Sequence, residues 1–172
     1  MADLWFRSQV NRVPVTRVLV TALILAVHGA IAAPAAHADD RRMNSAVVQD
    51  VQIIQGTAGC TSTVRVSPKL QLAAQWHALD VIDDRTLDRD IGSDGSTVQS
   101  RAAAAGYMGA VAETVAINPA LSISGIELIN QWYHNPAYLE IMQNCNFTQI
   151  GVWTEHRIDR TVVVAVYGQP TA

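Results

Sequence analysis

The chain has 172 residues, of which 49% are hydrophobic and 16% are charged, and its formal net charge is −3. This length and composition suit one globular domain. A mildly acidic chain without a basic cluster is a poor candidate for binding nucleic acid or an anionic membrane surface.

Residues 1–38 have the pattern of a secretory signal peptide. A basic region comes first and contains Arg7, Arg12 and Arg17. An apolar run over 18–33 follows, and Ala36-His37-Ala38 fits the small-x-small sequence before a cleavage site, so we expect cleavage after Ala38. The alternative is a retained membrane anchor, but the run is short for a span and contains His28. The mature chain is therefore predicted to be secreted, outside the cell or in its envelope, with no stable membrane span after cleavage.

Two cysteines, Cys60 and Cys145, lie in the predicted mature chain. In an exported protein such a pair most simply forms one disulfide, although two buried free thiols are an alternative. The loop that this bond would close is long, so it would stabilise the fold by roughly 4 kcal/mol through the unfolded state.

Two helices are predicted in the first half of the mature chain. Apolar residues at positions 47, 48, 51 and 54 predict a helix over 46–56 that ends at Gly56. Ser67-Pro68 combines a capping residue with a proline at the first helical position, which predicts a helix over 68–83. His77 lies on the apolar stripe of this second helix, so we expect a core histidine and not a ligand.

A charged loop, a short helix and a strand are expected next. The loop holds several aspartates, but their spacing and the interleaved arginines favour a solvated loop over a calcium site. The sequence Ser96-Thr97-Val98-Gln99 reads as a capping box that opens a short helix ended by Gly106. Residues 111–118 have the composition of a strand.

The last third is predicted to contain one helix and two strands. A capping box over 124–127 opens a helix that carries Trp132 and should end or kink near Asn135, because Pro136 follows. Residues 147–153 and 161–169 are rich in β-branched side chains, and residues 154–160 would join them as a hairpin. The second strand is apolar at nearly every position, which is typical of a central strand covered on both faces.

The order of these elements predicts an α/β (α+β) fold with one domain over about 44–169. Helices on both sides of a small antiparallel sheet, an α-β-α sandwich, satisfy the pattern. We expect the domain to act as a monomer.

Five segments in order make the chain resemble the CAP superfamily, which contains cysteine-rich secretory proteins, antigen 5 and pathogenesis-related protein 1. The segments are LQLAAQWHALDV, GSDGSTVQSRAAAAGY, VAETVA, QWYHNPAYLEIMQNCNFTQIGVW and VVVAVYGQ. The chain is most similar to small secreted bacterial members of the actinobacterial kind. The resemblance implies an α-β-α sandwich with a central cleft.

In many members that cleft holds two histidines and two acidic residues that can bind a divalent metal. Depending on which flanking motif sets the register, the first histidine position falls on Arg89 or Asp90, and an arginine cannot ligate a metal. The first acid is kept as Glu113, whereas the second falls on Asn135 and the second histidine on Tyr138. We therefore expect no metal site of the family's kind and no cofactor.

The leading hypothesis is a secreted, non-catalytic CAP-like domain that binds an apolar or lipid ligand, or an envelope or protein partner, through its cleft. The cleft candidates are Glu113, Asp90, Arg89, His134, Asn135 and Tyr138. One alternative is a hydrolase that uses Glu113 as its general base, and another is a purely structural envelope protein. A carboxylate in an apolar strand must be paired, hydrogen-bonded or facing a cleft. Because the histidine positions of the resemblance are not kept, a structural hydrogen-bonding role for Glu113 is favoured over a cleft acid.

Overall fold

The computed structural model describes residues 35–87 and 90–171, and these form an α+β fold. The predicted signal peptide lies outside the described residues except for its last four. The elements in chain order are α1 (Ala35–Thr57), β1 (Arg65–Val66), α2 (Pro68–Asp83), α3 (Val98–Ala104), β2 (Ala110–Asn118), α4 (Gly125–Tyr133), α5 (Pro136–Gln143), β3 (Gln149–Arg157) and β4 (Arg160–Gln169). None of the described helices is both long enough and apolar enough to cross a membrane.

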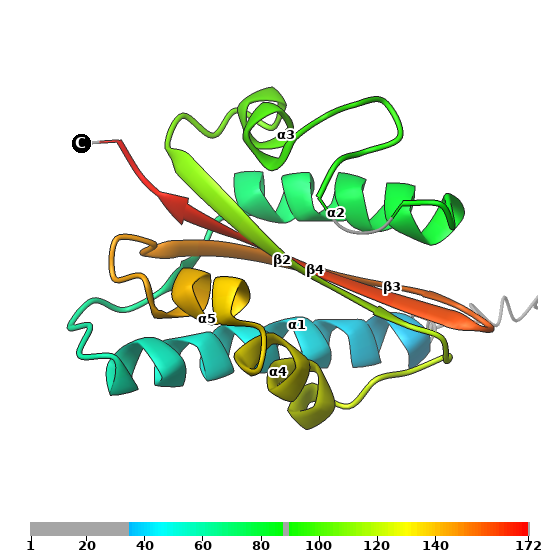
Figure 1. Cartoon of the computed structure of the whole chain (residues 1–172), viewed down its shortest axis with the longest axis horizontal. Coiled ribbons are helices and arrows are strands. Elements are labelled where there is room, and N and C mark those ends of the chain that lie inside the picture. Colours follow the sequence, from blue (N-terminus) through cyan, green and yellow to red (C-terminus); the bar gives the residue numbers. More distant parts are fainter. Residues whose placement is uncertain (1–34, 88–89, 172) are drawn as a thin grey trace, which may run out of the picture. The chain divides into compact units, whose positions relative to one another are not determined.

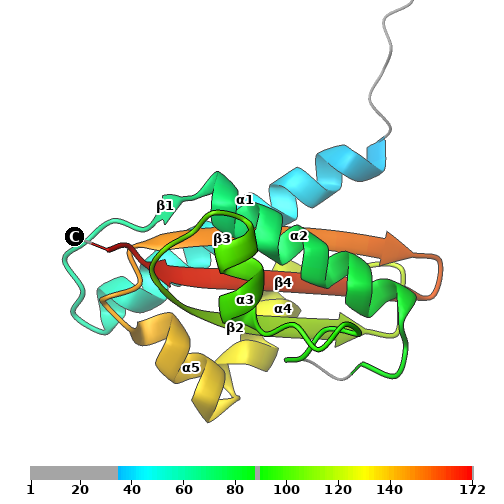
Figure 2. The same cartoon turned by 90° about the horizontal axis from the view of Figure 1, so that it is seen from above.

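The helices form two layers around one sheet, which confirms the predicted sandwich. Helices α2 and α3 cover one face, whereas α1, α4 and α5 cover the other (Figure 1). The strand order is β1-β3-β4-β2, and α2 lies over the middle of the sheet (Figure 2). The sheet is mixed and not wholly antiparallel as predicted, because β1 pairs with β3 in parallel. This strand has only two residues, both exposed, so no apolar pattern marks it in the sequence.

Strand β4 is the central strand that its composition predicts. It is buried at nearly every position and pairs antiparallel with both β2 and β3. The hairpin is tighter than expected, because β3 and β4 pair as far as Arg157 and Arg160. His156 consequently belongs to β3, where it pairs with Asp40 of α1 and contacts Thr161.

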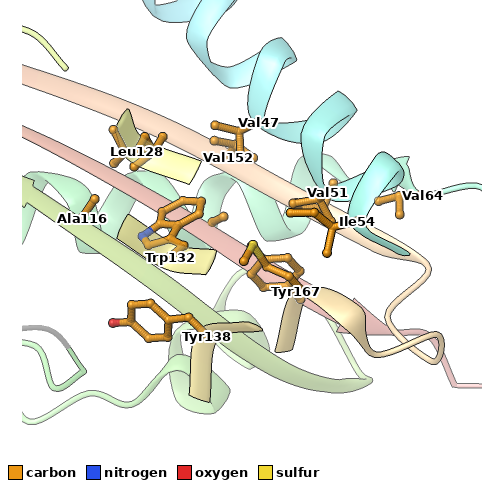
Figure 3. Close-up of a cluster of buried hydrophobic side chains, with 14 of the residues drawn as sticks. Val47, Val51, Ile54, Val64, Ala116, Leu128, Trp132, Tyr138, Val152 and Tyr167 are labelled. Carbon is orange, nitrogen blue, oxygen red and sulfur yellow. The ribbon is translucent and has the colours of Figure 1, made fainter. Parts of the chain in front are cut away.

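Two hydrophobic clusters lie on the two faces of the sheet. The cluster beneath α1, α4 and α5 contains Trp132, which is 1% exposed, together with Tyr138 and Tyr167 (Figure 3). The cluster beneath α2 and α3 contains Leu70 of α2, Tyr107 of the segment after α3, and buried residues of β2 and β4. Alternate residues of each strand therefore face opposite layers.

Two glycines allow the α2 layer to approach the sheet closely. A Cβ on Gly151 would lie 2.0 Å from the backbone nitrogen of Gln71 in α2. A Cβ on Gly168 would lie 2.4 Å from the hydroxyl oxygen of Tyr107 and 2.7 Å from Leu70 Cδ1. Both positions therefore exclude a side chain for reasons of packing.

Local signals set most helix boundaries. Helix α2 begins at Pro68 as predicted, although Ser67 makes no side-chain cap bond. The N-cap of α3 is Thr97, one residue later than the capping box suggested, and its hydroxyl accepts a hydrogen bond from the backbone nitrogen of Ser100. Helix α1 is longer than predicted, because its first turns extend before the apolar stripe that begins at Val47.

The disulfide between Cys60 and Cys145 is present. It links the loop after α1 to the segment after α5, across 85 positions of sequence. The predicted pairing is therefore confirmed.

Candidate functional site

Glu113 lies on the face of β2 that contacts α2 and α3. Its neighbours on the same face, Val111 and Val115, belong to the cluster beneath these helices. The Glu113 residue is 7% exposed. Its Oε1 accepts a hydrogen bond from Arg101 Nη2 at 2.6 Å, which forms a buried ion pair with α3. The apolar strand around this carboxylate predicts that it needs a partner, but no sequence pattern identifies Arg101 as that partner.

Arg101 joins the strand to the loop before α3. Its Nη1 donates to the backbone oxygen of Ser96 at 2.7 Å, and its Nη2 donates to that of Asp90 at 3.3 Å. The residue is 5% exposed, so these bonds form with little competition from water. One guanidinium thus holds both ends of the segment 90–96 against β2.

Burial dominates the electrostatics of Glu113. Loss of solvation raises the pKa of Glu113 to about 7, although the charge and hydrogen bond of Arg101 act in the opposite direction. The nearby charge of Asp90 raises the pKa of Glu113 further. The carboxyl group therefore titrates near neutral pH.

His77 is a core residue, as its place on the apolar stripe of α2 predicts, and it is 0% exposed. Its Nε2 lies 3.9 Å from Glu113 Oε1, so α2, α3 and β2 each contribute one residue to this buried polar cluster. No sequence pattern predicts this contact, because the three residues lie in three different elements of the chain. They meet only because α2 and α3 pack on the same face of the sheet.

The remaining cleft candidates lie elsewhere. Asn135 is the N-cap of α5, and its side chain accepts hydrogen bonds from the backbone nitrogens of Ala137 and Tyr138. Tyr138 is 9% exposed and belongs to the cluster on the opposite face from Glu113 (Figure 3). His134 is exposed at the end of α4, where its Nδ1 lies 2.8 Å from the backbone oxygen of Asn130.

The five candidates that the structure describes are therefore divided between two parts of the molecule. Glu113 contacts the Asp90 segment through Arg101, whereas His134, Asn135 and Tyr138 follow α4 and begin α5. Arg89 lies outside the described residues. Within residues 35–87 and 90–171, no group of three or more His, Cys, Asp or Glu side chains is arranged to hold a metal ion.

A cavity of about 580 Å³ lies beside the buried cluster. Arg101 lines it, but Glu113 does not. The other lining residues come from α2, the 93–96 segment and α3: Trp76, Asp80, Ser93, Asp94, Ser96, Ser100 and Ala104. The cavity mixes an indole with carboxylates and hydroxyls, and none of the five candidates among the described residues lines it.

Compared with protein-family models and with curated protein sequences, the chain shows no match. Solved structures do match it. An outer surface protein of Borrelia burgdorferi superimposes with a TM-score of 0.61 at 16% identity, covering 73% of this chain and 90% of that one.

Two further matches are described as an SCP-domain protein and as a cysteine-rich secretory protein. An extracellular protein of Bacillus anthracis that contains an SCP domain has a TM-score of 0.65 at 14% identity, with 76% of this chain and 41% of that chain covered. A cysteine-rich secretory protein of Staphylococcus aureus has a TM-score of 0.58 at 10% identity, with 76% and 39% covered. The chain thus spans about two fifths of these two longer proteins, and it has the fold of SCP-domain, cysteine-rich secretory proteins that its sequence motifs predicted.

Proposed function

We propose that this protein is a secreted, non-catalytic CAP-like domain that binds a component of the cell envelope or a protein partner outside the cell. The fold neighbours named above are outer surface, extracellular and secretory proteins by their own descriptions. The disulfide and the signal-peptide pattern support the same location.

The observation that carries the non-catalytic role is the position of Glu113. A general base must reach the proton that it removes, directly or through one water. Glu113 is buried, its Oε1 is bonded to Arg101, and the adjacent cavity is lined by Arg101 instead. The carboxylate therefore acts as an anchor for Arg101 and for the segment 90–96.

One observation favours the alternative, a hydrolase. A carboxyl group whose pKa is raised to about 7, with an imidazole 3.9 Å away, is chemically suited to proton transfer. Arg101 occupies Oε1, and Oε2 is buried without a hydrogen bond to any described residue, so a substrate could reach the carboxyl group only if the packing around it opened. The burial of Glu113 therefore speaks against this function.

Two measurements on the purified exported protein test the proposal. Sedimentation with purified bacterial cell wall should show saturable binding, whereas sedimentation with phosphatidylglycerol vesicles should show less, because the chain is mildly acidic and has no basic cluster. Hydrolysis of p-nitrophenyl esters should remain at background and should be unchanged by Glu113→Gln. Ester hydrolysis that Glu113→Gln abolishes, in a variant that keeps its circular dichroism spectrum, would establish the hydrolase instead. Absence of binding to wall and vesicles alike would contradict the proposed binding role.

A further inference from the structure

We propose that the cavity between α2 and α3 is a binding site for a neutral saccharide chain. This inference rests on the proposed function and names the class of envelope component that the domain recognises. The cavity, about 580 Å³, is within the size range of small-molecule sites.

An indole forms one wall of this cavity. Trp76 is 39% exposed, whereas Trp132 in the opposite core is 1% exposed. Asp80 lies four residues later in α2 and lines the same cavity, so the indole and the carboxylate share one face of the helix. An aromatic face beside hydrogen-bonding groups suits a sugar ring, whose C–H face is apolar and whose edge carries hydroxyls.

Hydrogen bonds between α2 and the 93–96 segment hold the polar groups of the cavity in a fixed arrangement. Asp80 accepts hydrogen bonds from the backbone nitrogen and the hydroxyl of Ser93, at 2.7 and 2.6 Å. Asp94 Oδ1 accepts from the backbone nitrogen of Ser96 at 2.8 Å. Hydrogen bonds from the Ser96 hydroxyl and from its backbone nitrogen hold the pKa of Asp94 below its usual value. Each carboxylate has further lone pairs that can accept hydrogen bonds from sugar hydroxyls.

Close packing builds this arrangement. A Cβ on Gly92 would lie 2.6 Å from Ser96 Oγ and 3.0 Å from Asp80 Oδ2, so a glycine is needed for these groups to converge. Gly95 has a φ of +78°, a conformation that glycine adopts most readily. The carboxylates and hydroxyls are therefore positioned before any ligand arrives.

Arg101 distinguishes a saccharide from a cation as the ligand. Two carboxylates with an indole would also suit an ammonium group. However, Arg101 lines the same cavity, and its buried Nε makes no hydrogen bond to any described residue. The carboxylate acceptors, the guanidinium donor and the serine hydroxyls of this cavity together match a neutral polyhydroxylated ligand better than a cationic one.

Titration of the exported protein with chitotetraose and with cellotetraose, followed by calorimetry and by tryptophan fluorescence, tests this site. At least one sugar should bind saturably and change the emission. Trp76→Ala should weaken that binding about tenfold or more, whereas Trp76→Phe, which keeps an aromatic face, should weaken it less. Asp94→Asn should also weaken it.

Leu72→Ala is the matched control. Leu72 is 37% exposed one turn earlier on α2 and does not line the cavity, so its truncation should leave sugar binding unchanged. Failure of both sugars to bind, or binding that Trp76→Ala does not weaken, overturns the inference. Binding to purified cell wall that survives Trp76→Ala would also overturn it, while leaving the proposed function intact.

Discussion

Replacing Arg101 with glutamine should destabilise the fold, and the loss should grow with pH. Arg101 is the cationic partner of Glu113, and both residues are buried. In the folded protein the pKa of Glu113 is about 7, against an ordinary value of 4.5. Because the pKa is raised in the folded state, the contribution of Glu113 to wild-type stability is fully present below pH 4.5 and is lost as the pH rises through about 7.

The magnitude follows from two contributions. At pH 5.5, where Glu113 is protonated in the fold, the substitution removes mainly the hydrogen bonds from Arg101 to the backbone oxygens of Ser96 and Asp90, at a cost of about 2 kcal/mol. Above pH 7 the wild-type carboxylate ionises beside Arg101, but in the variant it must stay protonated or remain unpaired. Each pH unit above 7 therefore adds up to about 1.4 kcal/mol to the stability that the variant loses relative to the wild type. The total loss is about 4 kcal/mol at pH 8.5.

Urea unfolding followed by circular dichroism, at pH 5.5 and pH 8.5, measures both losses. Arg85→Gln is the control, because Arg85 pairs with Asp159 at 2.7 Å and the two side chains are 62% and 55% exposed. Solvent screens that pair, so its removal should change the stability little at either pH. Equal losses for Arg101→Gln at the two pH values would refute the argument that Arg101 stabilises an ionised, buried Glu113.

Three further substitutions test the packing, the disulfide and a helix cap. Gly168→Ala should lower the free energy of unfolding by about 1–3 kcal/mol, because the new Cβ overlaps neighbouring side chains. Gly125→Ala should cost much less, because a Cβ there meets nothing within 4 Å. Equal urea midpoints for the two variants would contradict this. Cys60→Ser with Cys145→Ser should lower the free energy of unfolding by about 4 kcal/mol, since the bond closes a loop of 85 positions, and reduction of the wild type should give the same loss. Asn135→Ala should cost about 1 kcal/mol by removing the N-cap of α5, and Asn135→Asp should retain most of that stability; a thermal melt that does not distinguish the two variants would argue against capping.

Short-range signals in the sequence determined most of the architecture. The segment 161–169 is apolar at nearly every position, which is typical of a strand buried on both faces, and it belongs to the central strand β4. Pro68 and Ser124 mark helix starts because each meets a local requirement of a first helical turn, so the sequence alone locates them. The disulfide pairing was predictable because the chain has two cysteines and an N-terminal pattern typical of an export signal.

Tertiary structure decided which polar residues meet. Alternation along β2 directs Glu113 toward α2 and α3, whereas Tyr138 packs in the cluster on the other face of the sheet. The sheet therefore separates two positions that the resemblance to the CAP superfamily assigns to one cleft. Arg101 lies in an alanine-rich helix that offers no local sign of an ionic partner in a strand. The contacts of Arg101, His77 and Glu113 depend on packing between three separate elements. Local sequence patterns indicate the preference of each element for helix or strand, but they do not determine which side chains face each other across the core.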